Sequence, residues 1–508
     1  MPRHFNTAGP CQADIHYTLP TERRLPGVRA LVDQRAYFVL HAPRQAGKTT
    51  ALLSLARALT AEGRYAAVLL SVEVGAPFAE AAEAIPAMVR SLRQQAEHWL
   101  PGELWPPDTT TDAPGAAIQG LLGAWAAACP RPLVVFIDEV DALQGKPLLS
   151  ILRQVRAGYP SRPGGFPHSV ALCGMRDVRD YRADDGRLGT ASPFNIKVES
   201  FTLANFSRDD VAELYGQHTA ETGQSFTPEA TALAFHLSDG QPWLVNALAR
   251  QCVEVIVPGG QQAVEVTHVR AAAERLVQRM DTHLDSLAER LREPRVRAIV
   301  APILLGTAFP NTPPDDLDYA VDLGIVKRGA GGGLVLANPI YAQVIPRVLA
   351  TPVRMSLDGI RPHWLTPAGE LDPARLLSSF TAFWRQHGRM LMGSAPYAEV
   401  AAQLVMMAWL DRVANGEGWI DREYAVLRGR IDLCLHYRGQ RFAFELKAWR
   451  PGQGDPAPDG VEQLDGYLDG LGLPTGWLVV FDQRGEPVEP SVRTATAASG
   501  RRVTVVVV

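Results

Sequence analysis

Residues 37–63, YFVLHAPRQAGKTTALLSLARALTAEG, contain three patterns in direct succession. The apolar run at 37–40 predicts a short buried strand. A loop that contains proline and glycine comes next. Apolar residues then recur at the spacing of one helix face: Leu52, Leu55, Ala56 and Leu59. This stretch therefore predicts a strand, a loop and a helix, with Gly63 just beyond the helix end.

Further apolar runs predict strands at 66–72, 133–137, 169–173 and 194–198. These runs are apolar on both faces and alternate with helical segments, which is typical of a parallel sheet covered by helices on both sides. We therefore predict an α/β fold, with a parallel-sheet core in residues 1–202.

The loop HAPRQAGKTT, residues 41–50, lies where such a fold binds phosphate. Free amides at a helix start, together with the helix dipole, attract anions. Lys48 is suited to reach the β- and γ-phosphates of a nucleotide, and the Thr49 hydroxyl to bind Mg²⁺. The phosphate-loop pattern usually begins with glycine, and Ala42 stands there instead. The predicted nucleotide-binding residues are Ala42, Arg44, Gln45, Ala46, Gly47, Lys48, Thr49 and Thr50.

The segment LVVFIDEVDAL places Asp138 and Glu139 directly after a buried strand. A carboxylate at this position can hold Mg²⁺, and its neighbour can orient an attacking water. The alternative is a pair of surface carboxylates that cap the next helix. Because both motifs follow in order on a parallel-sheet pattern, we favour an ATP site with Mg²⁺, with Asp138 as metal ligand and Glu139 as catalytic residue.

The order of these strands and motifs resembles the AAA-like P-loop ATPases, in particular the archaeal-type and STAND-related branch. The resemblance implies a γ-phosphate sensor after the fourth strand, for which Arg176 is the candidate and Asp177 its partner. It also implies a Gly-x-Pro signature near the nucleotide, which Gly240 and Pro242 match in SDGQPWLVNALA. An ordinary helix–helix turn is the alternative at that position.

The remaining chain suggests further parts. Residues 203–290 read as successive helices and form a candidate helical lid. Residues 291–350 contain a helix at 315–323 and two short strands around a glycine-rich tip, which is a winged-helix-like pattern with Lys327 and Arg328 near its wing. We interpret 351–389 as a linker and 390–508 as a smaller mixed α/β domain.

A second chemical pattern lies in YAVLRGRIDLCLHYRGQRFAFELKAWR, residues 424–450. Asp432 lies in a strand that turns at Arg438-Gly439. In the returning strand, period two places Glu445 and Lys447 on one face, which Asp432 could share. Two carboxylates and a lysine suit Mg²⁺ or Mn²⁺ and a water nucleophile. The alternative is an exposed strand with a cross-strand salt bridge.

The segment resembles the PD-(D/E)xK nuclease superfamily, with Asp432, Glu445 and Lys447 as its signature. The resemblance implies that Glu399, on the preceding helix, is a further metal ligand. It also implies that Gln463 and Tyr467 on a later helix accompany the site. Family members often keep this fold after losing cleavage, so activity is a separate question.

Composition limits the classes of function. The chain has 508 residues, with 50 Lys and Arg against 54 Asp and Glu, and a net charge of −4. Any nucleic acid must therefore bind at a local site rather than through bulk charge. The five cysteines form no CxxC pair, and no apolar stretch reaches the length of a membrane span. We expect a soluble, cytoplasmic protein without a membrane partner.

The combined hypothesis is an ATP-binding and ATP-hydrolysing protein coupled to a metal-dependent nuclease that acts on nucleic acid. Two alternatives stay open. In one, the chain is an ATP-driven switch whose C-terminal domain is an inactive module that binds nucleic acid or protein. In the other, nucleotide merely stabilises a non-catalytic regulator. Assembly into a homo-oligomer is also left open.

Overall fold

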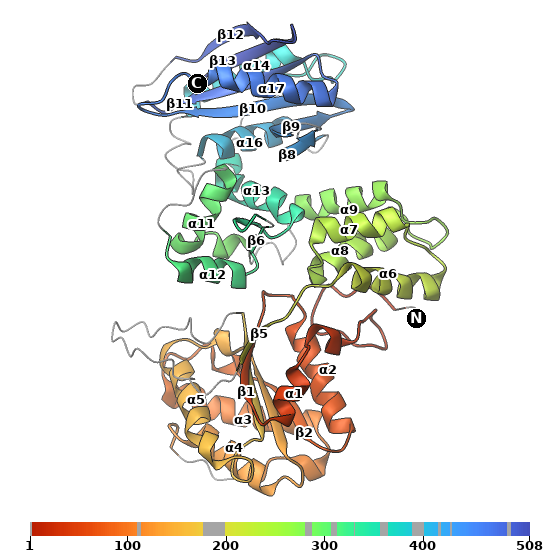
Figure 1. The fold of residues 1–508 in the computed structure, drawn as a ribbon, viewed down its shortest axis with the longest axis vertical. Coiled ribbons are helices and arrows are strands. Elements are labelled where there is room, and N and C mark those ends of the chain that lie inside the picture. The colour runs from red at the N-terminus through yellow and green to blue at the C-terminus, as the bar shows by residue number, and fades with distance from the viewer. Residues whose placement is uncertain are drawn as a thin grey trace. The chain divides into compact units, whose positions relative to one another are not determined.

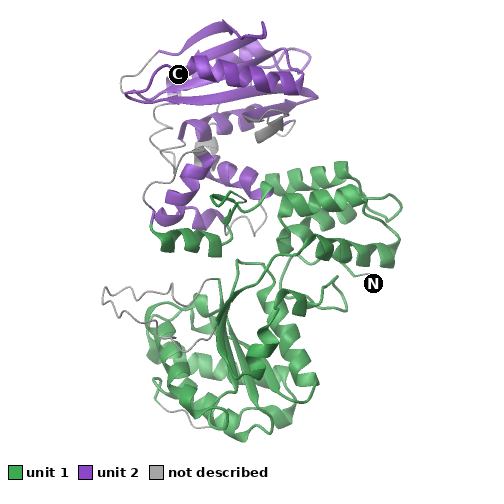
Figure 2. Ribbon diagram, in the orientation of Figure 1, with its two compact units in different colours: residues 1–279, 313–339 green, residues 280–312, 340–508 purple. Residues whose placement is uncertain are grey.

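The protein is described here from a computed structural model, which covers residues 3–108, 113–175, 199–279, 287–305, 312–329, 331–355, 364–388, 401–414, 418–426, 429–484 and 489–508. The chain divides into two compact units (Figure 2). The first unit comprises Met1–Arg279 and Pro313–Pro339, and the second comprises Met280–Thr312 and Ile340–Val508.

The first unit is built on a parallel five-stranded sheet with the strand order β2-β3-β4-β1-β5. Its strands are β1 (Tyr37–His41), β2 (Ala66–Ser71), β3 (Leu133–Asp138), β4 (Ser169–Gly174) and β5 (Glu199–Thr202). The first four match the predicted strands to within one residue, so the predicted α/β class is confirmed. The fifth predicted strand, 194–198, lies outside the described residues, and β5 was not predicted.

Alternate residues of the sheet pack against helices on its two faces (Figure 1). Phe38 and Leu40 pack with α1 and α2, whereas Tyr37 and Val39 pack with α3, α4 and α5. This double burial explains why β1 to β4 are apolar at successive positions, and not only at alternate ones, along most of their length. The helices are α1 (Val28–Asp33), α2 (Lys48–Ala61), α3 (Ala81–Trp99), α4 (Ala117–Ala128) and α5 (Gly145–Gly158), with short 3₁₀ turns η1 (Thr21–Arg24), η2 (Glu73–Gly75), η3 (Gly102–Leu104), η4 (Val140–Ala142) and η5 (Tyr159–Ser161).

Residues 203–279 continue as helices, as the sequence predicts: α6 (Arg208–Thr222), α7 (Pro228–Ser238), α8 (Pro242–Gln251), the π-helical turn η7 (Cys252–Ile256) and α9 (Val266–Arg279). Local signals define the helix starts. Ser207 and Asp210 form a reciprocal capping box on α6, and Pro228 and Pro242 occupy the first turns of α7 and α8.

The predicted helix and hairpin of the winged-helix-like region are present as α12 (Pro314–Asp322), β6 (Val326–Arg328) and β7 (Leu334–Leu336). The two strands pair antiparallel. These elements belong to the first unit, whereas α11 (Pro294–Leu305) and α13 (Pro339–Met355) from Ile340 onward belong to the second. A winged helix over 291–350 and the other predicted domain boundaries therefore stay predictions.

The second unit contains a mixed sheet in the order β12-β13-β11-β10-β9-β8. Its strands are β8 (Gly418–Val426), β9 (Gly429–Tyr437), β10 (Gln440–Trp449), β11 (Thr475–Asp482), β12 (Ser491–Thr496) and β13 (Arg502–Val507). The helices are α14 (Pro373–Phe383), the π-helical turn η8 (Trp384–Gly388), α16 (Ala401–Ala414) and α17 (Ala457–Leu471). The predicted order of helix, hairpin, helix and strand is found in α16, β9–β10, α17 and β11, whereas β8, β12 and β13 were not predicted.

The β9–β10 hairpin turns at Arg438 and Gly439, as predicted. Both residues have positive φ, 45° and 82°, which is typical of the two-residue turns that match strand twist. One face of the sheet packs on α17 through Ala443 and Leu478, and the other packs on α14 and α16 through Phe444 and Trp477. The side chains at 443, 445 and 447 consequently share the α17 face.

Within the described parts of the chain, none of the helices combines the length and apolar character that crossing a bilayer requires.

Replacing Gly240 by alanine is expected to destabilise the first unit. A Cβ there would stand 1.9 Å from the Phe206 carbonyl oxygen, in a backbone with φ of +69°. The left-handed backbone alone costs an L-residue about 1 kcal/mol, and with the steric clash we expect a loss of at least about 2 kcal/mol in the free energy of unfolding. Urea denaturation followed by circular dichroism measures this loss.

Gly216→Ala is the matched control, because Gly216 lies inside α6 and a Cβ there meets nothing within 4 Å. The free energy of unfolding of that variant should rise by about 0.5–1 kcal/mol. Equal denaturation midpoints for the two variants would contradict the account of Gly240.

Candidate functional site

The loop between β1 and α2 has the backbone of a phosphate-binding loop. Gln45 and Gly47 have positive φ, 57° and 84°, and the chain enters α2 at Lys48. Ala42 lies outside the left-handed region, so alanine is free of strain where the usual pattern has glycine. The loop presents the free amides of a helix start, which is the arrangement that binds phosphate.

The Lys48 side chain is held over this loop by backbone carbonyls of the loop itself. Its Nζ donates to the carbonyl oxygens of Ala42 at 2.6 Å and of Pro43 at 2.9 Å. The ammonium group therefore lies at the loop mouth, where phosphate oxygens could replace the two carbonyls as its acceptors.

Thr49 and Asp138 form the centre of the site. The Thr49 hydroxyl donates to Asp138 Oδ2 at 2.7 Å, and Asp138 Oδ1 accepts the Glu139 amide at 2.9 Å. Asp138 is only 3% exposed, so these bonds offset the loss of water around a buried carboxylate. A hydroxyl and a carboxylate in contact at the end of a phosphate loop are the hard oxygen ligands that Mg²⁺ takes beside a nucleotide. The site therefore fits the predicted metal.

Glu139 is half-buried beside this pair. Its backbone is left-handed, with φ of 60°, and it lies directly after β3. Burial and the neighbouring Asp138 raise the pKa of Glu139 to about 6. A partly desolvated carboxylate at this position can accept a hydrogen bond from a water that attacks the terminal phosphate.

A pocket of about 540 Å³ opens beside Thr49 and Asp138. One wall is the N-terminal segment Pro10–Asp14, whose Cys11 amide donates to the Thr50 hydroxyl at 3.1 Å. The opposite wall includes Trp99 of α3. This N-terminal wall was not predicted, because the polar segment at the start of the chain carries no motif.

The predicted Gly-x-Pro signature forms a tight turn between α7 and α8. Asp239 and Gly240 have positive φ, 50° and 69°, and Pro242 is buried at the first turn of α8. The Gln241 side chain accepts the Leu244 amide at 2.6 Å and caps the helix. The structure therefore shows a helix–helix turn at this position, while nucleotide contact by Pro242 stays a prediction.

The segment from Gly324 into β6 contacts both this turn and the phosphate loop. Lys327 forms an ion pair with Asp239 at 2.6 Å. A Cβ on Gly324 would stand 2.4 Å from Pro43, so only glycine allows this approach. Arg328 is paired with Asp318 at 3.0 Å. Both basic residues near the predicted wing thus face carboxylates of their own unit.

Arg176 and Asp177, the candidate γ-phosphate sensor and its partner, lie outside the described residues. The same holds for Glu399, the candidate metal ligand of the C-terminal domain.

The second predicted site is assembled on β9 and β10. Asp432 Oδ2 accepts the Leu446 amide at 2.8 Å, which places its carboxylate beside β10. Lys447 Nζ donates to Glu445 Oε1 at 3.0 Å and to Gln463 Oε1 at 2.7 Å. Gln463 in turn donates to the Tyr467 hydroxyl at 2.8 Å. The predicted group is therefore brought together, and α17 supplies its polar cover.

Glu445 has the character of a cation ligand. Its side chain is 1% exposed, and its Oε2 lacks a hydrogen-bond partner among the described residues. Burial and the charge of Asp432 raise the pKa of Glu445, and Lys447 lowers it. Burying such an oxygen without a partner is costly, and a divalent cation would satisfy it. No cluster of three or more His, Cys, Asp or Glu side chains suited to a metal occurs in the described ranges.

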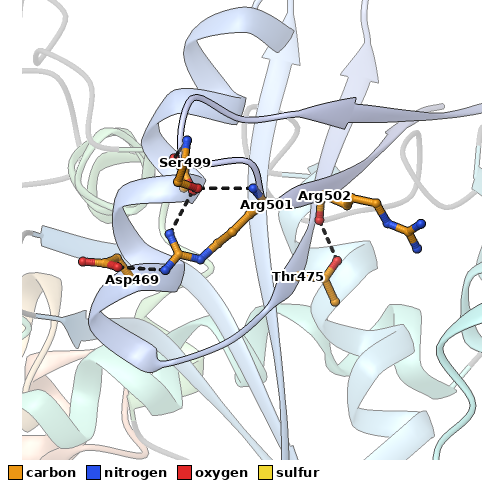
Figure 3. Close-up of polar contacts among 6 residues, drawn as sticks. Asp469, Thr475, Ser499, Arg501 and Arg502 are labelled. Carbon is orange, nitrogen blue, oxygen red and sulfur yellow. Dashed lines mark hydrogen bonds and ion pairs between the residues drawn. The ribbon is translucent and has the colours of Figure 1, made fainter.

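Another polar group lies where β12 turns into β13 (Figure 3). Arg501 is paired with Asp465 at 3.3 Å and with Asp469 at 2.8 Å, both on α17. Ser499 donates to Asp465, and Thr475 donates to the Arg502 carbonyl oxygen. The Arg501 charge is matched by two carboxylates, so we assign this group to holding the hairpin on α17.

The chain was compared with known proteins. No family model matches it, and no curated protein matches it. Among solved structures it is similar to the Walker-type ATPase PABY2304 of Pyrococcus abyssi, with 15% identity, a TM-score of 0.47, and coverage of 67% of this chain and 99% of that one.

It is also similar to the Aeropyrum pernix ORC2 protein, with 14% identity, a TM-score of 0.41, and coverage of 66% and 92%. A third similar structure is the Thermotoga maritima RuvB Holliday junction branch migration motor, with 14% identity, a TM-score of 0.34, and coverage of 64% and 93%. At these values the similarity adds nothing on activity, so the functional assignment depends on the geometry of the site.

Thr49→Val is expected to weaken binding of Mg²⁺–ATP about 10-fold or more, because it removes the hydroxyl that is predicted to ligate the metal and keeps the side-chain shape. Binding of ATP in EDTA should change much less, since the amides and Lys48 remain. Isothermal titration in the two conditions measures the difference. Ser54→Ala, farther along α2, is the control, and equal losses with and without metal would contradict the role of Thr49.

Proposed function

We propose that this chain is an ATP-binding and ATP-hydrolysing P-loop protein of the AAA-like type. The observation that carries the proposal is the hydrogen bond between Thr49 and Asp138 at the mouth of the phosphate loop. It joins the start of α2 to the end of β3, in the strand order β2-β3-β4-β1-β5. The loop amides, Lys48 and this pair together provide what a triphosphate and its magnesium need.

Each side chain of the site has a separate role in this proposal. Lys48 exchanges its two carbonyl acceptors for phosphate oxygens when nucleotide binds, and its charge remains there as negative charge develops. Thr49 and Asp138 would hold Mg²⁺, which would neutralise phosphate charge. Glu139 orients the attacking water. Residues 1–202 form the ATPase core in this proposal, and 203–290 form a helical lid.

Glu139→Gln tests hydrolysis. It keeps the size of the side chain but replaces one carboxylate oxygen with an NH2 donor and removes the negative charge and the basicity, so we expect a fall of about 10²-fold or more in ATP turnover with ATP affinity retained. Phosphate release and nucleotide titration measure the two quantities.

Glu83→Gln, at an exposed position of α3, is the control and should hydrolyse ATP at the wild-type rate. If Glu139→Gln turns over ATP as fast as this control, or if neither wild-type nor variant hydrolyses ATP, the proposed hydrolysis is wrong.

We propose in addition that residues 390–508 form a PD-(D/E)xK-like domain that cleaves nucleic acid with Mg²⁺ or Mn²⁺. Three features support this. Asp432 and Glu445 are adjacent on neighbouring strands, the buried Glu445 Oε2 lacks a protein partner among the described residues, and Lys447 is anchored between Glu445 and Gln463. The carboxylates would hold the cation, and Lys447 would position water or stabilise the negative charge of the transition state.

Coupling between the two sites completes the proposal: ATP binding and hydrolysis would alter the lid and the winged-helix-like region, and so control cleavage. Two contacts support the first step. Gly324, just before β6, lies against Pro43 of the phosphate loop, and Lys327 of β6 pairs with Asp239 of the lid turn. The alternative is an ATP-driven switch whose C-terminal domain binds nucleic acid or protein without cutting it.

The variant Lys447→Ala distinguishes a nuclease domain from an inactive binding module. Wild-type protein is expected to cut plasmid DNA or single-stranded substrates with Mg²⁺ or Mn²⁺, and the variant to lose about 10²-fold or more of that rate. Gel electrophoresis against time measures cleavage.

Lys146→Ala is the matched control, because Lys146 lies in an exposed ion pair with Glu80 far along the chain from this site. Wild-type protein that cuts neither DNA nor RNA, with or without ATP, would favour the inactive binding module. Equal cleavage by Lys447→Ala and Lys146→Ala would show that the activity comes from another site.

A further inference from the structure

We propose that Arg24 is a positioning residue that couples the phosphate loop to the hinge of the helical lid. The hinge is the segment 203–207 between β5 and α6. The proposal rests on the proposed ATP binding and adds a component that neither the phosphate-loop motif nor the lid signature contains.

Arg24 supports the phosphate loop from behind. Its Nη2 donates to the Ala46 carbonyl oxygen at 2.6 Å. Ala46 directly precedes Gly47, and a Cβ on Gly47 would stand 3.2 Å from Arg24 Nη1. The guanidinium therefore lies against the residues that set the left-handed turn into α2, and it fixes the direction of the peptide group between Ala46 and Gly47.

The same side chain holds the hinge. Nε and Nη2 both donate to the Ala204 carbonyl oxygen, at 2.9 and 2.7 Å. The guanidinium also lies over the Phe206 ring, 4.8 Å from its centroid. One planar group thus bridges two backbone segments that are about 160 residues apart, which the fork of an arginine can do and a lysine cannot.

The hinge passes this restraint to the lid turn. The Phe206 amide donates to the Gly240 carbonyl oxygen at 2.8 Å, and the Phe206 carbonyl lies so close to Gly240 that no Cβ fits there. Asn205 Nδ2 donates to the Asp239 carbonyl oxygen at 3.0 Å. A chain of direct contacts therefore runs from Ala46 through Arg24 and the hinge to the Gly-x-Pro turn.

Arg24 is also a buried cation next to the anion site. It is 8% exposed, and its hydrogen-bond acceptors are backbone carbonyls. Burial lowers the pKa of Arg24 to about 10, and Asp210 raises it, so the side chain keeps its charge at neutral pH. A fixed positive charge behind the loop adds to the attraction of phosphate.

The neighbouring Arg23 offers an internal control. It lies in the same turn, η1, but is half exposed and pairs with Glu213 at 2.5 Å and Asp210 at 3.8 Å, both on α6. Removing Arg23 takes away one positive charge and its two surface ion pairs, yet leaves the contacts of Arg24 with Ala46 and Ala204 intact.

Arg24→Gln, Arg24→Lys and Arg23→Gln in the full chain test the proposal. We expect Arg24→Gln to weaken Mg²⁺–ATP binding about 10-fold or more, Arg24→Lys to lie between it and wild type, and Arg23→Gln to stay within about 2-fold. Titrations are run well below the melting temperature of each variant. Amide hydrogen exchange of residues 203–207 is measured with and without ATP, because ATP-dependent protection there should be lost when Arg24 is replaced.

The outcomes are distinct. If Arg24→Lys and Arg24→Gln melt at lower temperature but bind ATP like wild type and keep the hinge protection, Arg24 is structural and the proposal is overturned. Arg24→Lys decides the matter alone if Arg24→Gln does not fold. Wild-type protein that does not bind ATP overturns the proposed function as well, whereas wild-type binding matched by every variant overturns the role of Arg24 alone.

Discussion

The hydrogen bond between Thr49 and Asp138 is the contact on which the rest of the first unit depends. It requires the start of α2 and the end of β3 to meet at one edge of the sheet. Parallel strands in the order β2-β3-β4-β1-β5 provide this, because every carboxyl end lies at the same edge. Burying Asp138 is tolerated because both of its oxygens accept hydrogen bonds. The sheet therefore brings a cation-binding group to the phosphate loop.

The two candidate sites use buried carboxylates in different states. Asp138 is satisfied by a hydroxyl and a backbone amide, so its site is held together without metal. Glu445 shares one oxygen with Lys447, while the other lacks a partner among the described residues. By this argument metal should matter more for the local stability of the C-terminal site than for that of the phosphate loop. Arg24 and Gly324 also contact the phosphate loop. Arg24 donates to the Ala46 carbonyl oxygen, and Gly324 lies against Pro43.

The elements that could be predicted from the sequence are those with a strong local pattern of residue types. Strands buried on both faces read as apolar runs, and the loop, the Asp138–Glu139 pair and the β9–β10 hairpin follow from residue types at fixed spacing. The edge strands β5 and β12 were not predicted. None of the residues of β5 and β12 is buried and most are polar, so these strands have no apolar pattern. Arg24 could not be found, because its acceptors are backbone carbonyls, one of them 180 positions away. The ion pair between Lys327 and Asp239 likewise depends on the tertiary fold.

The most direct test of the central claim is a crystal structure of the full chain grown with a non-hydrolysable ATP analogue and Mn²⁺, with the metal located by its anomalous signal. We expect a metal peak about 2.1 Å from the Thr49 hydroxyl, next to Asp138, with Lys48 turned from the Ala42 carbonyl to the phosphates. Nucleotide bound elsewhere, or an empty phosphate loop at saturating analogue and metal, would contradict it.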